Sequence, residues 1–500
     1  MKGPDRLAVG RFIATWWLPA VIACAVGALY VCYSVAQWRA LVAPSWDLGI
    51  FAEAVQAYSR FEAPIVPIKG PGYNLLGDHF HPILALLGPI FRLFPSALTL
   101  LVVQDLLIAA SVLPIARLAQ RLLGRGGALL VGLAYGLGWG LQGAVGVQFH
   151  EVCMAVPLLA FGGVAFVERR WGACMAWLAP LVLVKEDLGL TVFVAGLALA
   201  WRRRGEGWSA VLRSIAYALF GIVAFVLTVK VLLPAINPAG TWAYSLDGAA
   251  TGAGTPTGGT TAARAIPSLW DILTTPSVKL VTLIVLAAGA GFVGTASPWF
   301  ALVAPTLAWR FAGSVESYYG WDSWHYNAVL VPIAACSLLD LIDQWLAPER
   351  ADADSAAQSR DEATASSNLG WRVAAWAAAC VPAASLALTA SSLPLWHLPD
   401  LKEDARMAAA LGALDAVPEG VSVETDTTLL ARLVPGREVY WVGTTGTVDT
   451  PPEYVVIDAR SYAWGDQQVD AESWGSAAHP GYSYETVYAK QGFRVVRRTS

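Results

Sequence analysis

The sequence TWWLPAVIACAVGALYVCY at residues 15–33 contains no charged side chain and has about the 20 apolar residues that a helix needs to cross a bilayer. Similar apolar runs recur up to about residue 396, separated by short charged or Pro/Gly-rich breaks. Basic residues before the first run are typical of a signal peptide, but the run is too long and no A-x-A cleavage site follows cleanly. We therefore expect an uncleaved first transmembrane helix.

The composition also indicates a membrane protein. Of the 500 residues, 56% are hydrophobic and 14% are charged, whereas about 25% are charged in an average soluble domain. The mean hydropathy is +0.52. The formal net charge of −4 provides no overall positive charge, so no nucleic-acid partner is expected.

The positions of Lys and Arg predict the orientation, because these residues resist translocation and stay in inner loops. Keeping the four main basic clusters on the inner side requires about eleven transmembrane helices, with the N-terminus inside and the C-terminus outside the bacterial cytoplasmic (inner) membrane. The predicted helices cover residues 13–33, 96–122, 127–147, 152–168, 171–185, 187–201, 211–234, 276–295, 298–312, 326–346 and 371–393.

The segments between these helices divide into outer loops and an inner linker. We expect a first outer loop at 34–80, an interfacial helix at 81–94 that is too short to cross, and a Gly/Thr-rich outer loop at 235–275. The segment 348–370 is predicted to be a flexible inner linker. Together these elements make up a membrane domain at 1–396.

From 397 to 500 the composition becomes that of a soluble protein. A helical run at 400–416 precedes four strand-like segments, VSVET, REVYWVG, EYVVIDA and FRVVRR. These patterns predict a small extracytoplasmic α/β domain. It would serve as a lid or partner-docking module, or it would bind the acceptor of a reaction.

A carboxylate lies just after the first predicted transmembrane helix. Asp47, in SWDLGIF, is the leading candidate for a general base, since an outer-facing carboxylate within hydrogen-bond reach can accept a proton from a hydroxyl. The alternative is that Ser45 or Asp47 caps the short helix that follows, at 48–59.

Acidic and imidazole side chains gather at the predicted outer ends of the helices. Asp78, His79 and His81 lie within four residues, and His150 and Glu151 follow a later helix. This spacing is compatible with a divalent metal whose ligands would come from Asp47, Asp78, His79, His81, His150 and Glu151. Polar helix ends that face lipid headgroups are the more common explanation, so no cofactor is expected.

Lys185, Glu186 and Asp187 interrupt an otherwise apolar stretch. Either Lys185 pairs with its acidic neighbours, or it contacts a lipid phosphate as a point charge. The aromatic loop SVESYYGWDSWHYNAVLVP is typical of an interfacial belt. Alternatively, Trp321 or Trp324 stacks against the apolar face of a sugar.

The blocks SWDLGIF, GDHFHP, QFHE, VKEDLGL and HYNAVLVP resemble the signature blocks of DUF2079, a family of bacterial multi-pass membrane proteins, over nearly the whole chain. A broader resemblance is to the GT-C superfamily of polyprenyl-phosphate-sugar-dependent glycosyltransferases, of the protein mannosyltransferase and aminoarabinose transferase type. The features that carry it are an outer-loop acid, HFHPILALLGPIFRLFPSALTLL, the Val184-Lys185 pair, and His325-Tyr326 followed by Pro332.

The GT-C resemblance implies roles for particular residues. Asp47 would be the catalytic base, and Lys185 would face the donor phosphate, with His325 in place of the usual Arg. The superfamily often has an Asp-Glu pair in the first loop, whereas Leu48 follows Asp47 here. The implied donor-phosphate and sugar-binding residues are Lys185, His325, Tyr326, His79, His81, Asp78, His150, Glu151, Glu186, Asp187, Trp321 and Trp324.

The sequence therefore predicts a membrane glycosyltransferase that moves a sugar from a polyprenyl-phosphate donor to an envelope acceptor at the outer face. It leaves open the sugar, the acceptor and the oligomeric state. The alternatives are a non-catalytic lipid or solute carrier, which the missing internal repeat disfavours, and an envelope-sensing protein that acts through its outer domain.

Overall fold

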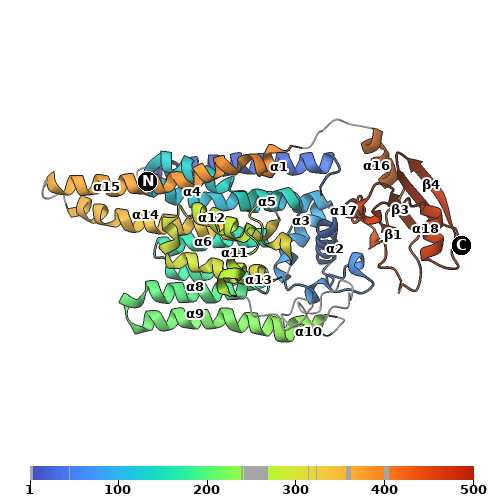
Figure 1. Ribbon diagram of the computed structural model, residues 1–500, viewed down its shortest axis with the longest axis horizontal. Coiled ribbons are helices and arrows are strands. Elements are labelled where there is room, and N and C mark those ends of the chain that lie inside the picture. Colours follow the sequence, from blue (N-terminus) through green and yellow to red (C-terminus); the bar gives the residue numbers. More distant parts are fainter. Residues whose placement is uncertain are drawn as a thin grey trace.

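A computed structural model shows a long helical bundle with a sheet domain at one end (Figure 1). The short helices α2 and α3 lie between the bundle and the sheet domain. The structure describes residues 4–43, 45–237, 240, 268–313, 315–322, 324–355, 362–398, 405–446 and 448–499. The fold class is the predicted one, a helical membrane-type bundle followed by a small α/β domain.

The bundle is made of long and short apolar helices. Among the described residues, five helical stretches are long and apolar enough to cross a membrane: Ala14–Arg39, Ala97–Gly136, Trp208–Ile236, His325–Ala347 and Leu369–Ser392. Shorter apolar helices cover Pro82–Leu93, Glu151–Val167, Trp171–Leu183, Leu188–Arg202 and Val278–Gly289. Each predicted transmembrane segment contains helix, whereas the number of crossings stays a prediction.

The individual helices of the bundle are bounded as follows. They are α1 (Pro4–Arg39), α2 (Trp46–Ser59), α3 (Gly88–Leu93), α4 (Ala97–Gly136), α5 (Trp139–Val147), α6 (Ala155–Val167), α7 (Trp171–Leu178), α8 (Leu188–Arg202), α9 (Trp208–Leu227), α10 (Leu233–Ile236), α11 (Leu269–Thr274), α12 (Val278–Gly289), α13 (Ala304–Ala312), α14 (Leu330–Ser355) and α15 (Glu362–Thr389). The 3-10 turns used below are η1 (Pro67–Lys69), η3 (Pro82–Leu87), η4 (Glu151–Met154), η5 (Ala179–Leu183) and η11 (His325–Asn327).

Helix α4 is a tight hairpin of two helices. Gly124 has φ +73° and ψ −168°, a conformation that is essentially restricted to glycine, and it reverses the chain. The Tyr135 hydroxyl donates to Ser111 Oγ at 2.7 Å, which joins the two halves side by side. The predicted break between 96–122 and 127–147 is therefore confirmed.

Several of the predicted loops contain helix, and their side of the membrane stays a prediction. The first outer loop contains α2, and the predicted interfacial segment is helical as η3 and α3. The flexible linker predicted at 348–370 is wrong at both ends, because α14 continues to Ser355 and α15 begins at Glu362. Ala and Glu have high helix propensity, which favours continuation of the two helices into this segment. Most of the predicted loop 235–275 lies outside the described residues.

The C-terminal domain contains one five-stranded sheet of order β2-β1-β3-β5-β4. β1 pairs in parallel with β2 and β3, and β5 pairs antiparallel with β3 and β4. All four predicted strands are formed. The prediction missed β4, in which most residues are exposed. The elements are α16 (Ala405–Asp415), β1 (Ser422–Thr425), α17 (Leu430–Leu433), β2 (Glu438–Trp441), β3 (Tyr454–Asp458), α18 (Ala471–Ala478), β4 (Tyr484–Lys490) and β5 (Phe493–Arg498).

Candidate functional site

Polar side chains from five separate segments meet at the end of the bundle near the sheet domain. Hydrogen bonds, ion pairs and ring contacts link the start of α2, the loop before η3, the α5–η4 connection, the break between η5 and α8, and η11. The connection between α5 and η4 is Gln148-Phe149-His150-Glu151. We call these four residues the QFHE segment.

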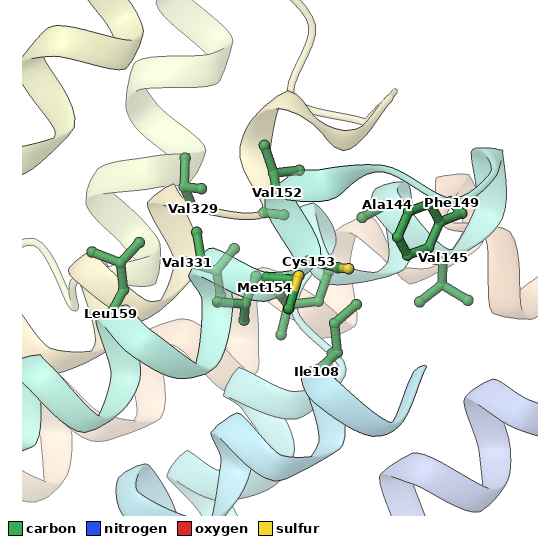
Figure 2. Packing of buried hydrophobic residues seen from close by; sticks show 14 of the residues in the cluster. Ile108, Ala144, Val145, Phe149, Val152, Cys153, Met154, Leu159, Val329 and Val331 are labelled. Carbon is green, nitrogen blue, oxygen red and sulfur yellow. The ribbon is translucent and has the colours of Figure 1, made fainter. Parts of the chain in front are cut away.

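The QFHE segment is anchored in a buried apolar cluster. Phe149 within the segment is fully buried, and the buried residues Val152, Cys153 and Met154 follow the segment in the chain. Figure 2 shows these side chains together with Ile108 of α4 and Leu159 of α6. Close packing of this kind fixes the backbone from which the polar side chains project.

Asp47 is held by two residues of the QFHE segment. Its Oδ2 accepts a hydrogen bond from Gln148 Nε2 at 2.7 Å and lies 3.3 Å from His150 Nε2. Gln148 also accepts from the Leu48 backbone N–H at 3.0 Å, so it orients both the helix start and the carboxylate. The Asp47 side chain keeps 29% of its surface exposed.

The alternative role of Ser45 or Asp47 as a helix cap is wrong. Helix α2 begins at Trp46, and no side chain caps its N-terminus. The Ser45 hydroxyl instead accepts from the Ala431 backbone N–H at 3.0 Å. Both side chains are directed to partners far away in the sequence.

Lys185 pairs with Glu151, and not with its acidic neighbours as one alternative held. The Nζ–Oε1 distance is 2.9 Å, and the Lys185 side chain is 13% exposed. An ammonium group has three N–H donors, and this ion pair occupies one of them. His150 and Glu151 are consecutive, so the QFHE segment contacts both the carboxylate of Asp47 and the cation of Lys185.

The two acids after Lys185 have their own partners. Glu186 Oε1 lies 2.7 Å from His79 Nδ1, and its Oε2 accepts from the Phe80 backbone N–H at 3.0 Å. Asp187 accepts from Trp309 Nε1 at 2.9 Å. These contacts tie the loop before η3 and helix α13 to the break before α8.

The His79–Glu186 pair shifts the pKa of both groups towards the charged forms. Burial disfavours the charge on His79, but the Glu186 carboxylate outweighs burial and raises the pKa of His79. Burial likewise opposes the charge on Glu186, and His79 and Lys185 outweigh it, so the pKa of Glu186 is lowered. The structure therefore favours an ion pair here.

Asp78 and His81, the neighbours of this pair in the sequence, make other contacts. Asp78 forms an ion pair with Lys69. His81 is buried with its ring 5.6 Å from that of Phe51, and burial lowers the pKa of His81 to about 4. Within the described residues no three His, Cys, Asp or Glu side chains are arranged to hold a metal ion. The metal hypothesis stays a prediction.

Aromatic side chains gather around His325 and Tyr326. The His325 imidazole stacks on that of His150, with ring centroids 3.4 Å apart. The Tyr326 ring contacts Tyr318 at 4.7 Å and Trp324 at 6.4 Å between centroids. Trp321 is partly buried against the core. The structure thus brings Tyr326 and Trp324 together beside His325.

Sequence reasoning missed two buried residues that hold the site. Gln104 of α4 accepts from the His150 backbone N–H at 3.1 Å and donates to the Gln148 carbonyl at 3.2 Å, which fixes the QFHE segment. Arg310 of α13 is fully buried and donates to the Tyr318 and Gly320 carbonyls and to Asn327 Oδ1. A polar residue inside an apolar run was the available signal for both.

The apolar helices, the polar site at one end and the sheet domain define a polytopic membrane protein with a candidate active site. The chain belongs to the family described as "Predicted membrane protein (DUF2079)", whose family model matches residues 38–495. This confirms the family that the sequence blocks indicated.

The solved structures similar to this chain include two of ArnT from Cupriavidus metallidurans. The structure bound to undecaprenyl phosphate is 16% identical, with a TM-score of 0.45, and the match covers 94% of this chain and 97% of that one. The apo structure is 15% identical, with a TM-score of 0.44 and the same coverage. None of the curated proteins compared with this chain matches it.

Proposed function

We propose that this protein is an integral-membrane glycosyltransferase that transfers a sugar from a polyprenyl-phosphate donor to an envelope acceptor at the outer face of the membrane. The observation that carries the proposal is the QFHE segment, which holds a partly exposed carboxylate through His150 and a lysine through Glu151. A base for a hydroxyl and a cation for a phosphate are the two groups that such a transfer needs.

The proposed reaction assigns a role to each group. Asp47 accepts the proton of the acceptor hydroxyl, whose oxygen forms a bond to the anomeric carbon of the donor sugar. The bond between that carbon and the phosphate oxygen breaks, and the electron pair leaves with polyprenyl phosphate. Among the described residues Lys185 donates to Glu151, and its remaining N–H donors would stabilise the charge on the departing phosphate. Tyr326 and Trp324 offer ring faces to a sugar.

The direct test is transfer of radiolabelled sugar from a panel of polyprenyl-phosphate sugars to envelope acceptors, with purified protein in lipid. We expect Asp47→Asn to lower kcat by about 100- to 10,000-fold. The matched control is Asp322→Asn, because Asp322 is an exposed aspartate in the nearby aromatic loop. Equal activity of Asp47→Asn and wild type would overturn the role of Asp47.

A second variant tests the role of Lys185. Removing only Lys185 leaves the buried Glu151 carboxylate unpaired, so the double variant Lys185→Met/Glu151→Gln removes both charges at once. We expect it to raise the KM for the donor more than it lowers kcat. An unchanged donor KM would show that the phosphate binds elsewhere.

The proposed location is the bacterial cytoplasmic membrane, with the sheet domain outside. Arg117 and Arg121 lie near the α4 reversal and pair with Glu168, which supports an inner position for these ends. In a background with the exposed Cys24, Cys32 and Cys380 replaced by Ala, an impermeant thiol reagent should label Ser476→Cys from outside and not Gly205→Cys. The reverse pattern would invert the topology.

One observation favours a carrier as the second candidate. Asp105 of α4 is fully buried, and neither of its carboxylate oxygens has a hydrogen-bond partner among the described residues. An ionisable residue at membrane depth often marks a transport path. A carrier predicts that Asp105→Asn abolishes function while Asp47→Asn does not, which is opposite to the enzyme prediction.

A further inference from the structure

Helix α2 has two opposite faces that contact different parts of the protein. Asp47 and Phe51, four residues apart, face the bundle: Asp47 meets the QFHE segment, and the Phe51 ring lies 5.9 Å from that of His150. The contacts with the sheet domain fall on the other side of the helix. Their spacing of three or four residues marks a single helix face, which carries Trp46, Gly49, Glu53 and Gln56, and Ser45 precedes it just before the helix.

The sheet domain contacts this second face along its whole length. The Ala431 backbone N–H donates to Ser45 Oγ at 3.0 Å, and that of Gly436 donates to Gln56 Oε1 at 3.1 Å. The rings of Trp46 and Trp441 meet edge to face, with centroids 5.1 Å apart.

The approach between α2 and the domain is close at Gly49. A Cβ on Gly49 would lie 3.2 Å from Leu430 Cγ and 3.1 Å from Ile68 Cδ1. The domain also reaches the end of α1, where the Arg432 guanidinium lies 3.9 Å from the centroid of the Trp38 ring.

Glu53 is the central residue of this interface. Its side chain is buried, with 5% of the residue exposed. Oε2 accepts from the Ile68 backbone N–H at 3.1 Å, and Oε1 accepts from that of Val439 at 3.3 Å. One carboxylate therefore joins α2 to η1 and to the edge strand β2.

We propose that the C-terminal domain clamps helix α2 against the bundle and thereby fixes Asp47, with Glu53 as a positioning residue. The role assigned to Asp47 rests on the proposed function, whereas the clamp itself rests on the contacts alone. A helix of 14 residues is marginal in isolation, so its order depends on packing from both sides. The domain supplies one of these sides.

The clamp is tested first without any activity measurement. In the full chain in lipid, we expect Glu53→Ala/Trp441→Ala to speed hydrogen–deuterium exchange in residues 47–59 while the hairpin of α4 stays unchanged. Glu485→Ala is the matched control, because Glu485 is an exposed domain glutamate paired with Arg497. Glu53→Gln keeps the side-chain size and provides a milder variant if the double variant folds poorly. Unchanged exchange in α2 with either variant would overturn the clamp.

A tether then tests whether the clamp positions Asp47. The 3.0 Å contact between Ser45 Oγ and the Ala431 backbone N–H makes these two positions the ones to cross-link, so Ser45→Cys/Ala431→Cys should restore slow exchange to the Glu53→Ala protein when oxidised and not when reduced. If transfer is observed, Glu53→Ala should lower kcat by up to about 100-fold with little change in donor KM, and the oxidised tether should restore it.

The outcomes separate this proposal from the proposed function. Faster exchange with unchanged kcat would overturn the positioning of Asp47. Faster exchange that the tether reverses, in a protein that transfers no sugar from any donor, would support the clamp and overturn the glycosyltransferase proposal.

Discussion

The imidazole rings of His150 and His325 stack with 24° between their planes and 3.4 Å between their centroids. They come from segments 175 positions apart in the sequence (325 − 150), and both rings are buried. His150 also contacts Asp47, so the stack connects the aromatic side chains around His325 and Tyr326 to the candidate base.

The stack predicts different outcomes for two substitutions of His325. Aromatic pairs contribute about 0.5–1.5 kcal/mol beyond their buried area, so His325→Ala should lower the Tm and leave His150 less well held. His325→Phe should retain most of the stability and of the transfer rate. Thermal unfolding and transfer assays check this. Equal losses of transfer in both variants would instead assign the role to an imidazole nitrogen.

Arg310 is predicted to be essential for stability. Removing its guanidinium removes charged hydrogen bonds to the Tyr318 and Gly320 carbonyls and to Asn327 Oδ1, at about 1.5–3 kcal/mol for each, so Arg310→Met should destabilise the protein by about 3 kcal/mol or more. Arg310→Lys should not rescue it, because an ammonium cannot reproduce the planar fork. The control is Arg213→Met, since Arg213 is exposed on α9. Similar Tm values for the Arg310 and Arg213 variants would contradict this role.

The His79–Glu186 pair predicts a pH window. The pKa of His79 is raised above its ordinary 6.5, so its contribution is complete below pH 6.5 and is lost as pH rises through the folded value. The pKa of Glu186 is lowered from 4.5, so its contribution is complete above pH 4.5 and is lost as pH falls through the folded value. The Tm difference between wild type and His79→Gln/Glu186→Gln should peak between these limits. A difference that does not vary from pH 4 to 9 would contradict the ion pair.

Gly124 is predicted to be intolerant of a side chain. Its φ of +73° combined with ψ of −168° costs a residue with a Cβ about 1–3 kcal/mol, although no described residue lies within 4 Å of the added atom. Gly124→Ala should therefore lower the Tm through backbone strain alone. Gly172→Ala is the control, since Gly172 also has open space but no positive φ. Matching Tm shifts would argue against a strained reversal.

The nature of the fold could be read from local sequence. Apolar runs and their breaks identify helices because each helix satisfies its own backbone hydrogen bonds. Alternating β-branched residues likewise identified four strands. Strand β4 was not predicted because most of its residues face solvent. The residue types at the outer ends pointed to Asp47, His150 and Lys185 because charges in an apolar protein are costly and therefore few.

The pairing of these residues could be decided only by the tertiary structure. Lys185 is next to two acids in the chain but meets Glu151, 34 positions away, and Glu186 meets His79, 107 positions away. Ser45 and Ala431, 386 positions apart, join α2 to the sheet domain. Sequence determines which segments enter the membrane and which groups need partners. The partner of each buried polar group depends on how the helix ends converge, because a hydrogen bond requires its two atoms within about 3 Å in space regardless of their separation in the chain.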